Sequence, residues 1–263
     1  MGIQTLSTAA PVLYLHYSSF LGLMYVSNPA SEALISEAKI EAGGEAEVKK
    51  GYTGRAGATA KAVAFLRSKG LFAANVIGRL DSVTVRDVPI AGGSSPYINV
   101  ALSDEEGQYV ISAPLSSGGV QMLVRKLANA EMGIETEINL FAKYDVSPNP
   151  LYAGRSFANH GASLIQKGIQ VPVVASTELV ALVDRQVQAL KDAGITDNSI
   201  VIPARNKATT QFHLDLLASL NAKAGVVPAP AVVAEVAPSV IPAPGVVFQT
   251  YDINEDLSNE IPF

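Results

Sequence analysis

Residues 225–250 set the strongest limit on how this chain can fold. The segment consists mostly of Val, Ala and Pro, and it contains five prolines and no Lys or Arg. Proline fixes its own backbone angle and lacks an N–H group, so a segment of this kind forms neither a regular helix nor a central strand. We expect residues 225–250 to form an extended, disordered linker. The folded body must therefore lie within residues 1–224.

The last thirteen residues, 251–263, combine acidic and apolar side chains. The residues with which this tip would bind a partner are Asp252, Glu255, Asp256, Glu260, Ile261, Pro262 and Phe263. Phe263 offers an aromatic ring and a free carboxylate, so a partner needs only an apolar cavity beside an Arg or Lys. Pro262 favours an extended backbone, which lowers the entropy cost of docking. The alternative is a frayed acidic terminus that only keeps the protein soluble.

The end of the chain, Glu260-Ile261-Pro262-Phe263 behind acids and a linker, resembles the C-terminal tip of bacterial single-stranded DNA-binding proteins. In that family the tip recruits replication, repair and recombination proteins, and the linker joins it to a DNA-binding OB-fold. Ser258 and Asn259 stand where the family usually has further acids, which weakens electrostatic steering. The body lacks the family's usual opening sequence, which suggests a phage, plasmid or other mobile-element version. The resemblance implies a cytoplasmic location in a bacterium or an infected host.

The charge and the cysteine content limit the kinds of binding that the body can perform. The chain has no cysteine, which excludes a disulfide framework and Cys-ligated metals. Five of the 24 acidic residues lie after residue 224, which leaves 19 acidic against 19 basic residues in the body. A neutral body argues against strong non-specific phosphate binding but is compatible with a local basic face.

No stretch of the body carries a catalytic, metal or cofactor motif. Residues 51–59 are rich in Gly but lack both the P-loop and the dinucleotide-binding spacing, and the three histidines are scattered. The acidic stretch 31–47 has no converging His, so we interpret it as a solvated loop or helix face. The apolar run 11–26 lacks a basic region before it and is too short for a membrane span, so we interpret it as one or two buried strands. We predict no enzyme, no cofactor and no membrane association.

Residues 72–171 show the clearest alternation of secondary structure. The expected elements are strands over 75–88, 97–102 and 109–113, a helix over 120–130, and strands over 135–144 and 157–169. Three strands, a helix and two strands are the order of an OB-fold, a small barrel, and Gly78 would let the first strand bend. We predict a mainly β protein with helices (α+β), with an OB-fold-like domain and N-terminal extension over residues 1–171.

Residues 172–224 are predicted to form a helical extension. Ser176 or Thr177 begins a helix that stops at Gly194, a short strand follows over 200–202, and a last helix covers 211–220. A helix over 58–69 in the N-terminal part stops at Gly70. The sequence leaves three alternatives for the function of this extension: packing on the barrel, self-association into a homo-oligomer, or a further DNA contact.

An OB-fold that holds single-stranded DNA needs rings for the bases and cations along the backbone. The aromatic candidates are Tyr97, Tyr109, Phe141, Tyr152 and Phe157. The cationic candidates are Arg55, Arg79, Arg86, Lys143, Arg155 and Lys167. Phe141 and Lys143 form the best pair, because the alternate residues Ile138, Leu140 and Ala142 would fill the core. For Tyr109 and Phe157, packing in the core is an equal alternative.

These patterns favour a non-enzymatic protein that binds and protects single-stranded DNA and recruits partners through its tip. A recombination or replication accessory protein that uses the tip without coating DNA is the alternative.

Overall fold

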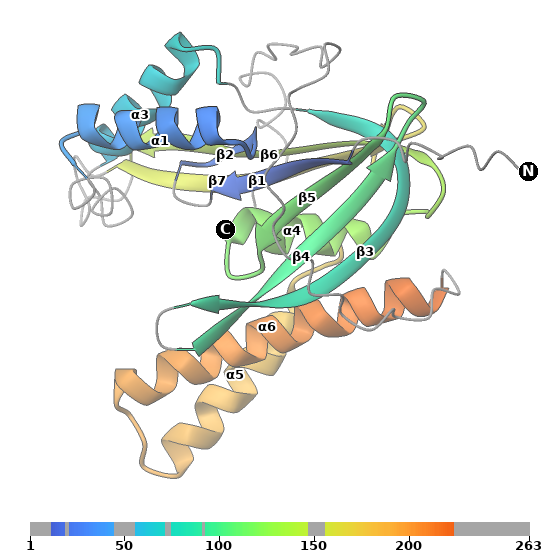
Figure 1. Cartoon of the computed structure of the whole chain (residues 1–263). Coiled ribbons are helices and arrows are strands. Elements are labelled where there is room, and N and C mark those ends of the chain that lie inside the picture. Colours follow the sequence, from blue (N-terminus) through green and yellow to red (C-terminus); the bar gives the residue numbers. More distant parts are fainter. Residues whose placement is uncertain are drawn as a thin grey trace, which may run out of the picture.

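A computed structural model describes residues 12–18, 21–44, 56–71, 75–90, 93–146 and 156–223. These residues form a mixed α+β fold (Figure 1). The strands are β1 (Val12–Ser18), β2 (Leu23–Val26), β3 (Val76–Ile90), β4 (Gly93–Ser103), β5 (Gln108–Pro114), β6 (Glu135–Val146), β7 (Ser156–Gln166) and β8 (Ile169–Gln170). The helices are α1 (Pro29–Glu41), α3 (Ala56–Ser68), α4 (Gly118–Leu127), α5 (Thr177–Asp192) and α6 (Asn198–Lys223).

The eight strands form one sheet in the order β2-β1-β5-β4-β3-β6-β7-β8. The predicted run of three strands, a helix and two strands is confirmed as β3, β4, β5, α4, β6 and β7. The closed barrel is not confirmed, because the sheet ends in two edge strands, β2 and β8. β1, which the sequence placed in the N-terminal extension, pairs in parallel with β5 and extends that side of the sheet. The irregularity in β3 falls between Leu80 and Ser82 rather than at Gly78.

The main core lies on the inner face of the curled sheet, where α4 packs (Figure 1). Leu123, Val124 and Leu127 of α4 are completely buried there. The curl brings β1 opposite β7, where the hydroxyl of Tyr17 and Nδ1 of His160 lie 2.8 Å apart. A side chain at Gly119 would come within 3.0 Å of the carbonyl oxygen of Gly161, so glycine is needed where α4 meets β7. The strands β1 and β7 therefore approach each other without forming a ladder.

A second core lies between the β1–β2 hairpin and the helices α1 and α3. Leu23 and Tyr25 of β2 are buried against Ile35 and Ala38 of α1 and Leu66 of α3. Asn28 and Ser31 form a capping box at the start of α1, which fixes the turn from β2 into the helix. The acidic stretch that begins at residue 31 is thus a helix as far as Glu41, and Glu32, Glu37 and Glu41 are exposed on it.

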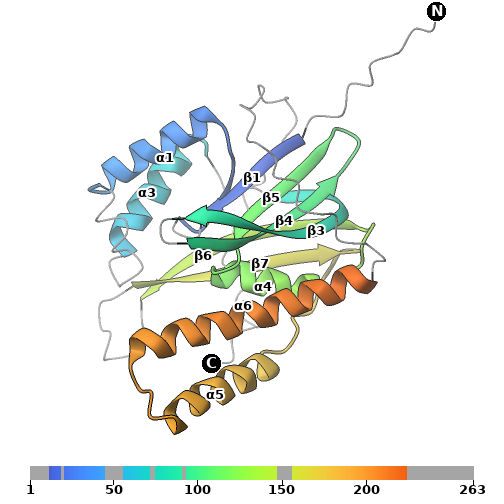
Figure 2. The ribbon, with the colours of Figure 1, turned by 60° about the horizontal axis from the view of Figure 1, so that its bottom comes forward.

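The helices α5 and α6 form a hairpin below the sheet, with α5 on the far side of α6 (Figures 1 and 2). Leu217 and Leu220 anchor α6 in the main core, and Asn221 donates a hydrogen bond to the carbonyl of Val83. The strand predicted over 200–202 is wrong, because α6 is continuous from Asn198 to Lys223. Asp197 accepts a hydrogen bond from the backbone N–H of Ser199 and so starts the helix, which overrides the strand preference of Ile200, Val201 and Ile202.

Among the helices in the described ranges, none is both long and apolar enough to cross a membrane.

Candidate nucleic-acid interface

A row of polar side chains crosses the outer face of the sheet, opposite the main core. On β4, the buried residues Ile98 and Val100 alternate with Tyr97 and Asn99, which point to this outer face. The strand register then places Thr84 of β3, Ser112 of β5 and His16 of β1 in line with Asn99. Arg86 lies directly opposite Tyr97. We call this set, His16, Thr84, Arg86, Tyr97, Asn99 and Ser112, the outer-face cluster.

Arg86 is the cation of the outer-face cluster. Its side chain runs from β3 across β4, and Nη2 donates a hydrogen bond of 3.1 Å to Oγ of Ser112 on β5. Two buried polar atoms of the cluster have no hydrogen-bond partner among the described residues. They are Nε of Arg86 itself and Oδ1 of Asn99. Buried polar atoms are seldom left unpaired, because desolvation without a hydrogen bond costs about 1–3 kcal/mol. The cluster thus holds one free donor and one free acceptor.

The edge of the cluster nearest α1 carries His16, which is an uncharged side chain there. Burial lowers the pKa of His16, and the nearby Arg86 lowers it further against an opposing effect of Glu32. His16 packs edge-to-face on Tyr25, with ring centroids 6.2 Å apart. Tyr25 donates a hydrogen bond of 3.2 Å to Glu32, and burial and then Glu32 raise the pKa of its hydroxyl. His16 is therefore uncharged at neutral pH, and Arg86 supplies the positive charge.

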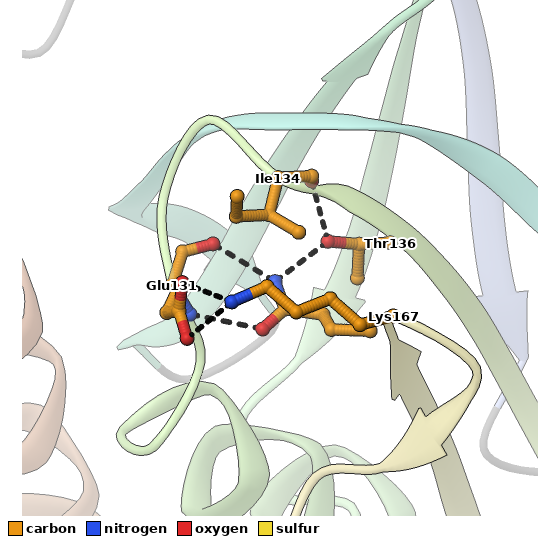
Figure 3. Close-up of polar contacts among 5 residues, drawn as sticks. Glu131, Ile134, Thr136 and Lys167 are labelled. Atoms are coloured by element: carbon orange, nitrogen blue, oxygen red, sulfur yellow. Dashed lines mark hydrogen bonds and ion pairs between the residues drawn. The ribbon is translucent and has the colours of Figure 1, made fainter.

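Two predicted cations, Arg79 and Lys167, are already engaged in ion pairs. Arg79 contacts Asp81 at 2.9 Å and lies seven residues from Arg86 on β3, about 24 Å along the strand. Nζ of Lys167 contacts both carboxylate oxygens of Glu131, at 2.9 and 2.8 Å (Figure 3). Neither residue belongs to the outer-face cluster.

Lys167 is part of a hydrogen-bonded network that holds the loop before β6. Gln166 donates to the carbonyl of Glu131 and to Oγ1 of Thr136, and it accepts from the backbone N–H of Glu131. Thr136 in turn donates to the carbonyl of Ile134 (Figure 3). We call Glu131, Ile134, Thr136, Gln166 and Lys167 the loop network. Its hydrogen bonds connect its members to one another, and Lys167 joins them through its exposed ion pair with Glu131.

The aromatic candidates on the described strands divide between the two faces. Tyr97 is on the outer face, whereas Tyr109 packs against the main core and its hydroxyl donates to Asp104 at 2.9 Å. Burial and the bond to Asp104 raise the pKa of Tyr109 to about 12. Phe141 is half-buried on the outer face of β6, opposite buried Ile138 and Leu140, as its alternation predicts. Its ring covers Gly161 on β7, where a Cβ atom would come within 2.5 Å of the ring.

Several predicted site residues lie outside what the structure describes. These are Arg55, Tyr152, Arg155 and the whole tip, Asp252, Glu255, Asp256, Glu260, Ile261, Pro262 and Phe263. The backbone of Lys143 lies in β6 and that of Phe157 in β7, and their side chains fall outside the described part.

Four members of the outer-face cluster were not predicted from the sequence: His16, Thr84, Asn99 and Ser112. Asn99 gives a local signal, because it is a polar residue inside the apolar run Ile98 to Leu102. His16 and Ser112 join the cluster only through the parallel pairing of β1 with β5. That pairing connects segments more than ninety residues apart in the sequence, so no local sequence pattern predicts it.

Within the described ranges, no group of three or more His, Cys, Asp or Glu side chains is arranged to hold a metal ion. Comparison of the chain with protein-family models, with curated proteins and with solved structures finds no match.

Proposed function

We propose that this protein binds single-stranded DNA on the outer face of β3, β4 and β5 and recruits other proteins through its C-terminal tip. The observation that carries the DNA-binding part is the cross-strand pair of Arg86 and Tyr97 beside the unpaired amide oxygen of Asn99. A guanidinium, an aromatic ring and a free acceptor are the groups that hold a phosphate, stack on a base and accept from a base edge.

The strand order supports an OB-fold as the basis of the DNA-binding domain. The ladders join β5, β4, β3, β6 and β7 in that order, and α4 connects β5 to β6. An OB-fold is a five-stranded, partly open barrel whose second and third strands bind oligonucleotides on their outer face. In this proposal β3 is the first strand, β4 and β5 are the second and third, and β1 fills the gap between β5 and β7. Tyr97, Asn99 and Ser112 then stand on the strands that OB-folds use for binding.

The charge of the body supports binding through bases more than through phosphates. The body is neutral overall, and two of the predicted cations are held in ion pairs with Asp81 and Glu131. Each phosphate contact adds about −0.7 to the salt dependence for single strands, so few free cations mean a shallow salt slope. Stacking contributes about 1–3 kcal/mol for each base and depends little on salt. We expect single strands to be preferred over duplexes, because bases are accessible only in single strands.

The residue types of the tip support the proposed recruitment of partner proteins. Phe263 is an aromatic residue that follows acidic residues and the proline-rich segment 225–250, so an apolar pocket can hold its ring. If this segment of 26 residues is extended, as its sequence predicts, it spans some 80 Å at about 3.1 Å for each residue. The partners in this proposal are replication, repair and recombination proteins of the bacterial cytoplasm, with an apolar pocket beside a cation.

The experiment for DNA binding is a fluorescence-anisotropy titration of the intact protein with a labelled single-stranded oligonucleotide and its duplex, over a series of salt concentrations. The expected result is tighter binding to the single strand, with a shallow salt slope. Binding to neither nucleic acid, in a folded protein, would reject DNA coating and leave the accessory role through the tip. Equal binding to both, with a steep slope, would indicate a purely phosphate-binding surface.

The experiment for recruitment compares the intact protein with a variant that lacks only Phe263. Calorimetric titration against a bacterial helicase or nuclease that binds such tips should show heat for the intact protein and none for the variant. The DNA affinity of both should be equal. Equal binding of the partner by both proteins would reject recruitment through the tip.

A further inference from the structure

The hairpin of α5 and α6 leaves apolar side chains in solvent on its surface. Val183 is the only buried residue of α5, and Val180 beside it is 52% exposed. In the first turns of α6, Ile200 and Ile202 are 48% and 51% exposed. A helix normally buries its apolar stripe against another element, and in the described ranges α5 packs mainly against α6.

Two of these exposed side chains, Val180 and Ile202, line a groove between the two helices. Its walls are formed by Leu179, Val180 and Val183 of α5 and by Ile202 and Thr209 of α6. One acid, Asp184, and one base, Arg205, also line it. No ion pair to Asp184 or Arg205 forms within the part of the chain that the structure describes. The groove thus combines apolar walls with one charge of each sign.

We propose that this groove is a self-association surface, on which a second copy of the chain docks about a two-fold axis. A two-fold interface brings the same patch of both copies together, so it must be complementary to itself. This groove meets that requirement, because Asp184 of each copy can pair with Arg205 of the other while Val180 and Ile202 pack at the centre. A partner with charge of a single sign would satisfy only one of the two groups.

The area of the surface indicates whether two copies can form a specific dimer through it. α5 has 16 residues, and a face two helices wide over that length covers about 24 by 20 Å. Two such faces bury on the order of 1,000 Å², the lower limit for a specific interface. We therefore expect a dimer that dissociates on dilution. α5 lies on the far side of α6 from the sheet (Figure 2), whereas the outer-face cluster lies on β1, β3, β4 and β5, so docking on the hairpin leaves the cluster open.

The first test is sedimentation velocity of the full chain over a wide concentration range. The wild-type protein should shift from monomer to dimer as its concentration rises. Ile202→Asp places a charge at the centre of the interface and should raise the dissociation constant at least tenfold. Ile169→Asp is the matched control, because Ile169 is 72% exposed on β8 and does not line the groove, and it should leave the constant unchanged. Circular dichroism melts check that both variants are folded.

A charge exchange distinguishes this interface from any other. Asp184→Arg and Arg205→Asp should each weaken the homodimer, because like charges then face each other across the axis. A mixture of the two variants should form a heterodimer, because one chain presents two cations and the other two anions. A wild-type monomer at all concentrations would overturn the proposal. A dimer that none of these substitutions weakens would also overturn it, since association would then use another face.

Discussion

The outer-face cluster and the loop network are both polar groups on the same sheet, and they differ in how far their hydrogen bonds are satisfied. In the loop network, Gln166 uses its donor and its acceptor groups, and Lys167 is paired with Glu131. In the outer-face cluster, Nε of Arg86 and Oδ1 of Asn99 are buried without a partner. A satisfied network stabilises the fold, whereas a donor and an acceptor without partners can take up the hydrogen bonds of a ligand. The comparison explains why Arg86, and not Lys167, is the better candidate for binding DNA.

The largest expected effect is on stability, from Gln166→Leu in the loop network. The substitution leaves the N–H and the carbonyl of Glu131 without partners next to an apolar side chain. We expect a loss of about 2–4 kcal/mol in the free energy of unfolding, measured by urea denaturation. Lys167→Ala is the control and should cost less than about 1 kcal/mol, because the ion pair is exposed. Equal losses from the two substitutions would contradict the structural role of Gln166.

The next effect is on DNA affinity, from Arg86→Ala in the outer-face cluster. Loss of the guanidinium should weaken single-strand binding by about 1.5–3 kcal/mol and reduce the salt slope by about one contact. Arg86→Lys should keep the slope and recover part of the affinity. Lys167→Ala should change neither quantity in the same anisotropy assay. Equal losses for Arg86→Ala and Lys167→Ala would remove the distinction between the two regions.

Tyr97→Ala tests stacking in the same cluster. We expect binding to weaken by about 1–2 kcal/mol with little change in the salt slope, because the ring carries no charge. Tyr109→Phe is the control. It removes a hydroxyl that bonds to Asp104 on the core side, so the affinity should stay the same. If Tyr109→Phe weakens binding and Tyr97→Ala does not, the wrong face of the sheet has been assigned to DNA.

The features of the fold and of the candidate site that could be predicted from the sequence are those made by residues close together along the chain. Alternation identified β3 to β7 and α4, and it placed Phe141 on the face opposite Ile138 and Leu140. Arg86 and Tyr97 were candidates by residue type, but their pairing depends on a register shifted by the bulge at Leu80 and Ser82. Lys167 was a candidate by residue type within the predicted strand 157–169, and its ion pair gave no local signal, because its partner Glu131 lies 36 residues away. Contacts between distant segments are set by tertiary packing, which no local pattern encodes.

The smallest expected effect is on the pH dependence of stability. We expect buried His213 to contribute more to it than His16 of the outer-face cluster. His213 is completely buried, and burial lowers its pKa. A histidine with a lowered pKa binds fewer protons in the folded than in the unfolded state, so stability is present above about pH 6.5 and falls as the pH drops. His213→Gln should flatten the decrease in Tm between pH 7.5 and 5. His16→Gln, at the half-buried position, should flatten it less, and a larger effect of His16→Gln would contradict this order.

The central claim, that single-stranded DNA lies on the outer-face cluster, is tested most directly by ultraviolet crosslinking of the intact protein to an oligothymidine strand, followed by mass spectrometry of the peptides. The account predicts crosslinks in β4 and β5, at Tyr97 and its neighbours, and none in the loop network around Glu131 and Lys167. Crosslinks confined to the loop network or to the helices α5 and α6, with none on β4 or β5, would contradict it.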